Sequence, residues 1–141
     1  MTPEQITLVQ SSFALVAPIS DTAATLFYDR LFELDPSLRK SFAEDLREQR
    51  LKLMTMLATA VNSLNRWGEI SPQVKKLGQR HIEYGVKPSD YATVGAALLD
   101  TLEKGLGDAF TPPVRQAWTA CYQAIAADMQ EAPDKTQPAK S

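Results

Sequence analysis

The sequence predicts an all-α protein, and three observations lead to that prediction. Apolar residues recur at three- and four-residue spacing along almost the whole chain, which is the period of an amphipathic helix. No run has the pattern of a β-strand. Proline and capping residues divide the chain into segments of ordinary helix length. We therefore expect six main helices and one or two short helical turns, and the 141 residues suit a single domain.

The first predicted helix begins after Thr2, which can cap it. Pro3 suits the first helical position, and Gln5 completes the pattern of a capping box. The helix ends at Pro18, because proline cannot continue the hydrogen-bonding pattern. Its apolar face is expected to consist of Ile6, Val9, Phe13 and Val16.

A second helix is expected to start at Ser20 and to end before Pro36. A short helical turn over residues 36–41 then leads to Phe42 and a polar corner. The long third helix is expected over residues 45–65. The apolar face of the second helix is formed by Ala24, Phe27, Leu31 and Leu34.

Turn residues delimit the remaining helices. Ser71-Pro72 is expected to open a shorter helix that Gly85 closes, and Ser89 to start the next one. Thr111 is expected to cap the last helix. Residues 132–141 are rich in Pro, Lys, Gln and Ser, so we expect a folded domain over residues 1–131 and a disordered tail after it.

Composition argues against several classes of function. The net charge of −2 and the scattered Lys and Arg residues provide no basic surface for nucleic acid or a membrane. A single cysteine, Cys121, cannot form an internal disulfide, and no signal peptide or membrane span is recognisable, which favours the cytoplasm. Because the sequence has neither Cys/His metal-site spacing nor a Gly-rich phosphate loop, a hydrolase or phosphoryl-transfer enzyme is not expected.

Three polar residues interrupt predicted apolar faces. Tyr28 follows Phe27 on the second helix, Gln49 lies within the apolar stripe of the third, and His81 lies on the apolar face of the fourth. Each has an ordinary structural explanation. Tyr28 could bury its ring and bond its hydroxyl to the backbone, Gln49 could lie at the boundary with solvent, and His81 could have a hydrogen-bond partner in the core. A buried polar group without a partner costs about 1–3 kcal/mol, so the three could instead form a network or face a polar ligand.

Four stretches of the chain, residues 26–32, 36–42, 80–95 and 117–122, have a characteristic order and spacing. Together they resemble the bacterial single-domain globins and the haem domain of flavohaemoglobins, over about residues 4–131. The arrangement is most similar to those globins whose distal pocket pairs a tyrosine with a glutamine. This resemblance implies a globin fold, in which the six main helices surround a pocket for haem b.

The resemblance also implies a role for individual residues around the haem. His81 matches the proximal histidine that binds the iron, and as the only histidine in the chain it excludes ligation by two histidines. Phe42 matches the phenylalanine that packs on the porphyrin. Tyr28 and Gln49 match the distal hydrogen-bond donors, and Leu53 matches the apolar residue above the iron.

Further contacts are expected at the edge of the same pocket. The Leu77 carbonyl is the expected acceptor for the second imidazole nitrogen of His81. Lys52 and Arg80 are candidates for pairing with the haem propionates, although both could simply be solvated. Tyr91 and Val94 are expected on the proximal side.

The function implied by the resemblance is reversible binding of O₂, or of NO or CO, to ferrous haem. The alternative is an NO dioxygenase that converts NO and O₂ to nitrate with an external reductase, and a haem-free interaction domain is a third class. Flavohaemoglobins carry a glutamate late in the last helix, near the proximal histidine. The corresponding position here is Pro133, and the nearest acid is Glu131. We expect a monomer or a weak homodimer.

Overall fold

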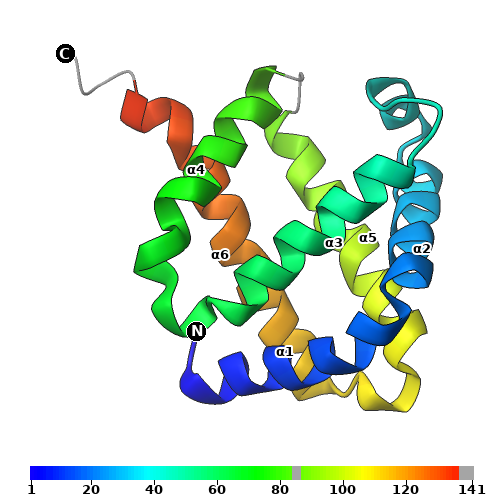
Figure 1. The fold of residues 1–141 in the computed structure, drawn as a ribbon, viewed down its shortest axis with the longest axis vertical. Helices are drawn as coiled ribbons and strands as arrows, with labels where there is room; N and C mark the ends of the chain where they lie inside the picture. Colours follow the sequence, from blue (N-terminus) through cyan, green and yellow to red (C-terminus); the bar gives the residue numbers. More distant parts are fainter. Residues whose placement is uncertain (84–86, 137–141) are drawn as a thin grey trace.

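The protein is described here from a computed structural model that covers residues 1–83 and 87–136. These residues contain six α-helices and no strand, which confirms the predicted fold class. Figure 1 shows the helices wrapped around one interior. Their bounds are α1 Pro3–Val16, α2 Ser20–Leu34, α3 Arg47–Asn62, α4 Trp67–Glu83, α5 Pro88–Leu106 and α6 Pro112–Thr136.

Local capping determines several helix boundaries as predicted. The Gln5 N–H donates to the Thr2 hydroxyl and the Thr2 N–H donates to the Gln5 side-chain oxygen, each over 3.1 Å, so the capping box of α1 is present. The Thr111 hydroxyl accepts from the Val114 N–H at the start of α6. The predicted short turn is a 3₁₀ helix, Pro36–Ser41, and Asp35 caps it by accepting from the Ser37 N–H.

Two predicted boundaries near the middle of the chain are wrong. The third helix is shorter than the expected 45–65, because Asp45 stays outside α3 and accepts from the Arg47 N–H over 3.0 Å. The fourth helix starts before the expected Ser71, and Pro72 lies inside α4. The extra turn is held by α6: the Trp67 indole N–H and the Ser71 hydroxyl both donate to Oδ2 of Asp128, over 2.8 and 2.7 Å.

Two later boundaries also differ from those expected. Helix α5 begins at Pro88 instead of Ser89, because the Asp90 carboxylate accepts from the Lys87 N–H at its start. Helix α6 extends to Thr136, so it includes the first residues of the segment 132–141 for which the sequence predicts a tail. Residues 84–86, which include the expected stop at Gly85, and residues 137–141 lie outside the described part of the chain.

The core lies where α1, α5 and α6 meet the interior faces of α2 and α3. Helix α6 packs against both α4 and α1, and α2 packs against α5. The indole N–H of the fully buried Trp118 donates to the Ser12 hydroxyl over 2.8 Å, which joins α6 to α1. Among the largest fully buried side chains are Val9, Leu31, Val61, Trp118 and Cys121.

Burial of Cys121 makes the stability of the protein sensitive to high pH. Burial raises the pKa of its thiol from 9.0 to about 12. Above pH 9 the unfolded chain therefore loses this proton while the folded protein keeps it. The free energy of unfolding is expected to fall between pH 9 and 12, with a slope approaching 1.4 kcal/mol per pH unit from this group.

Urea unfolding at several pH values between 8 and 11 measures this dependence. Cys121→Ala is expected to be less stable than wild type at pH 8, because it leaves a cavity, but to lose stability less steeply as the pH rises. Buried tyrosines contribute to the slope in both proteins, so the difference between the two slopes is the relevant quantity. Equal slopes would show that the thiol does not contribute.

Candidate functional site

Aromatic rings surround the hydroxyl-bearing side chain of Tyr28. Tyr28 is 4 % exposed on α2, and its ring makes edge contacts with Phe27 and Phe42 at centroid distances of 5.0 and 5.6 Å. Phe32 completes the group, 5.6 Å from Phe42. The structure thus brings together Tyr28 and Phe42, which the sequence analysis assigned to the same pocket.

Arg39 holds the corner that carries Phe42, and the sequence analysis did not identify it. Its guanidinium lies 5.3 Å from the centre of the Phe32 ring. The same group donates to the backbone carbonyls of Ala43 and Glu44, each over 2.9 Å. Carbonyl acceptors exist at every residue, so the sequence pattern carries no signal for this role.

Gln49, in the first turn of α3, reaches Tyr28. Burial raises the pKa of the Tyr28 hydroxyl, and a hydrogen bond with the Gln49 side chain opposes that rise. Tyr28 therefore stays protonated at neutral pH and retains its O–H as a donor.

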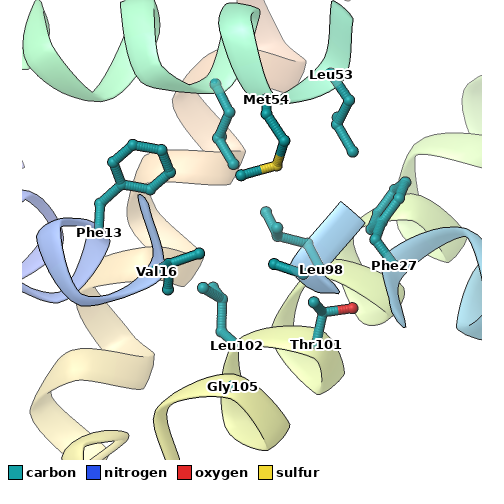
Figure 2. Close-up of a pocket in the computed structure, with 11 residues that line it drawn as sticks. Phe13, Val16, Phe27, Leu53, Met54, Leu98, Thr101, Leu102 and Gly105 are labelled. Carbon is teal, nitrogen blue, oxygen red and sulfur yellow. The ribbon is translucent and has the colours of Figure 1, made fainter. Parts of the chain in front are cut away.

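A small enclosed cavity is lined in part by Phe27, whose ring contacts Tyr28 (Figure 2). Its volume is about 20 Å³, which is space for one water-sized molecule. The hydroxyl of Thr101 is engaged with the Ala97 carbonyl over 2.8 Å, so the lining is effectively apolar. Four helices contribute to it: Phe13 and Val16 from α1, Ala23 and Phe27 from α2, Leu53, Met54 and Leu57 from α3, and Leu98, Thr101, Leu102 and Gly105 from α5.

His81 is half-buried in the last turn of α4. Its Nδ1 lies 2.8 Å from the Leu77 carbonyl oxygen, the acceptor expected from the sequence. Because a carbonyl oxygen can only accept, Nδ1 carries the proton in this contact. The hydrogen bond restrains the imidazole ring and leaves Nε2 as the ring nitrogen that faces away from the Leu77 carbonyl.

A groove separates α4 from the second half of α3. The two helices meet at the 3₁₀ turn Leu64–Arg66 and diverge from there (Figure 1). The groove has a volume of about 370 Å³, and Arg80 lies on its wall. Lys52, by contrast, pairs with Glu48 on the surface of α3 over 3.6 Å. The groove is lined by Met56, Thr59, Ala60, Ile70, Gln73, Val74, Lys76, Leu77 and Arg80.

Tyr91 and Val94 lie on α5, half-buried against the core. The hydroxyl of Tyr122 on α6 donates to the Tyr91 carbonyl over 2.7 Å, which holds the start of α5. The side chains of Glu131 and Pro133 lie outside the part of the chain whose side chains are described, as does Tyr84. The described residues contain no group of three His, Cys, Asp or Glu side chains that could hold a metal ion without a cofactor. Within that part, no helix is long and apolar enough to cross a membrane.

Comparison with known proteins identifies the family. Residues 25–129 match the Globin family model. The chain is 34 % identical to a flavohemoprotein of Bacillus subtilis over 124 residues, which are 86 % of this chain and 31 % of that protein. It is 33 % identical to a neuroglobin of Tetraodon nigroviridis over 118 residues, with 74 % of each chain covered. The chain thus spans about a third of the length of its flavohemoprotein relatives.

Solved structures agree with this assignment at the level of the fold. A bacterial globin from Campylobacter jejuni superposes with a TM-score of 0.84 at 22 % identity, over 96 % of this chain and 98 % of that one. An engineered carbene transferase from Rhodothermus marinus, described as a candidate nitric oxide dioxygenase, gives a TM-score of 0.84 at 23 % identity, over 100 % and 99 %. On the family match and the neuroglobin identity, this chain belongs to the globin family.

Proposed function

We propose that this globin binds haem b and holds O₂ reversibly, with His81 as the iron ligand and Tyr28 and Gln49 as hydrogen-bond donors to the gas. The observation that carries the proposal is the buried Tyr28 side chain, whose ring lies against Phe27 and Phe42 and whose hydroxyl interacts with the Gln49 side chain. Tyr28 is buried and Gln49 is half-buried, so a gas molecule beside them would meet two hydrogen-bond donors in surroundings that hold little water.

The residues present suit haem. A haem site of the globin type offers apolar walls and a histidine ligand, and cations can pair with the haem carboxylates. The groove between α3 and α4 has apolar walls, including Met56 and Leu77, and Arg80 at its side. His81 is the only imidazole in the chain. Bound haem would supply a ferrous iron with an open position for a diatomic gas.

His81 would act through the nitrogen that faces away from the backbone. Because Nδ1 is engaged with the Leu77 carbonyl, we assign Nε2 as the ligand atom. A hydrogen bond from Nδ1–H to a carbonyl also increases the basicity of the ligand nitrogen and limits rotation of the ring. The Leu77 carbonyl thus orients the proximal ligand.

Tyr28 and Gln49 would hold the gas through hydrogen bonds. The hydroxyl and the amide are both donors, so each could stabilise partial negative charge on a diatomic ligand. Leu53 and Phe27 border the enclosed cavity and provide apolar surface around the donors. Exclusion of water by such surface strengthens the hydrogen bonds that remain.

Haem titration of the purified protein tests the proposal. We expect one haem per chain and a spectrum typical of histidine ligation. His81→Gly is expected to bind haem at least about tenfold more weakly, which corresponds to a loss of ~1.4 kcal/mol or more. Added imidazole should restore the spectrum, because it replaces the missing ligand without changing the chain. If His81→Gly binds haem with an unaltered spectrum, then the assignment of His81 is wrong.

NO dioxygenation is the second candidate. The enclosed cavity beside Phe27 and Leu53 favours it, because it offers apolar space for a second small gas molecule. The net reaction joins NO and O₂ with one electron from an external reductase to give nitrate. Sustained NO consumption and stoichiometric nitrate formation with a supplied reductase would support this activity. A single turnover that then stops would leave gas binding as the function.

A further inference from the structure

Helix α4 approaches the backbone of α6 most closely at Gly78. A Cβ atom placed on Gly78 would overlap the carbonyl oxygen of Met129 and lie 2.6 Å from the carbonyl carbon and Cα of the same residue. These are backbone atoms of a helix, so they cannot rotate away as the end of a side chain would. Any residue larger than glycine at position 78 therefore requires α4 and α6 to move apart.

The adjoining residue of α6 holds α4 by a second contact. Asp128 precedes Met129, and its carboxylate accepts from Trp67 and Ser71 in the first turns of α4. Figure 1 shows α4 crossing α6. One turn of α6 thus fixes α4 at two places. Asp128 binds side chains near the start of α4, and the backbone of Met129 contacts α4 at Gly78. Together these contacts set the position of α4 as a rigid element.

We propose that Gly78 is a positioning residue, which sets where the last turn of α4 holds the His81 imidazole. The inference rests on the proposed role of His81 as iron ligand. His81 lies three residues after Gly78 on the same helix, and its ring is tied to the carbonyl of Leu77, the neighbour of Gly78. Displacement of α4 at position 78 therefore carries the imidazole with it, and the strength of the bond from His81 to the iron changes.

Gly68 provides a matched control within the same helix. A Cβ atom on Gly68 has no atom within 4 Å, outside its own helix backbone and its neighbours. Both substitutions replace a glycine of α4 by a better helix former, and only Gly78→Ala places a Cβ atom against Met129, so the comparison tests that contact. The two variants are compared with wild type as full-length, haem-loaded proteins.

Resonance Raman spectroscopy of the ferrous, gas-free protein measures the iron–histidine stretching band directly. We expect Gly78→Ala to shift this band and to release haem about tenfold faster, whereas Gly68→Ala keeps the wild-type band and rate. A general loss of stability would lower the melting temperature of Gly78→Ala without moving the band. A folded Gly78→Ala protein with the wild-type band would overturn the positioning role.

A second variant covers the case in which Gly78→Ala does not fold. Asp128→Ala adds no bulk but removes the acceptor shared by Trp67 and Ser71. It is expected to shift the same band, and an unchanged band then overturns the positioning role. If wild type shows no iron–histidine band, the proposed function fails and this inference falls with it. If wild type shows the band and no variant moves it, only the inference fails.

Discussion

Replacement of Tyr28 by phenylalanine is expected to speed the release of O₂ from the haem-loaded protein by about tenfold to a hundredfold. A hydrogen bond to a charged partner contributes about 1.5–3 kcal/mol, and each 1.4 kcal/mol is a factor of ten. Phenylalanine keeps the ring, so the edge contacts with Phe27 and Phe42 remain. Stopped-flow displacement of O₂ by CO gives the rate.

Tyr122→Phe is the matched control for this experiment. It also removes a tyrosine hydroxyl, but one that donates to the Tyr91 carbonyl on α5, away from the Tyr28 cluster. We expect its O₂ release rate to stay close to that of wild type. Gln49→Leu is expected to have an effect in the same direction as Tyr28→Phe. If Tyr28→Phe and Tyr122→Phe release O₂ at the same rate, then Tyr28 is not the distal donor.

The parts of the fold that depend on neighbouring residues could be predicted from the sequence. The capping box at Thr2 and the 3₁₀ turn before Phe42 are determined within a few residues, and both occur where expected. The start of α4 could not be predicted in this way. It depends on Asp128, which is 61 residues after Trp67 along the chain, and this contact outweighs the tendency of Pro72 to begin a helix.

In the candidate site, too, some residues could be predicted from the sequence and others could not. Tyr28 and Gln49 could be identified because polar residues on apolar faces need a partner, and the structure gives them one another. The link from His81 to the Leu77 carbonyl follows from helix geometry alone. Arg39 and Gly78 could not be identified, because both act on backbone atoms of distant or irregular segments. A sequence pattern describes side chains and does not report backbone contacts between helices.

Replacement of Trp118 by alanine is expected to cost about 3–5 kcal/mol in the free energy of unfolding, the usual range for a large buried aromatic residue. Trp118 is 0 % exposed, and its ring packs against Phe13 of α1 at a centroid distance of 6.3 Å. The same side chain bonds α6 to α1 through Ser12. Chemical denaturation of the haem-free protein measures this loss without a contribution from bound ligand.

Two smaller changes separate packing from hydrogen bonding at this position. Trp118→Phe keeps most of the ring but removes the indole N–H that donates to the Ser12 hydroxyl. The hydroxyl keeps its own hydrogen bond, because it still donates to the Leu8 carbonyl over 2.7 Å. Ser12→Ala leaves the buried indole N–H without its acceptor, which costs about 1–3 kcal/mol. If the two groups act as one unit, the double variant is less destabilised than the sum of the single variants. Additive losses would mean that Trp118 stabilises the α1–α6 contact by packing alone.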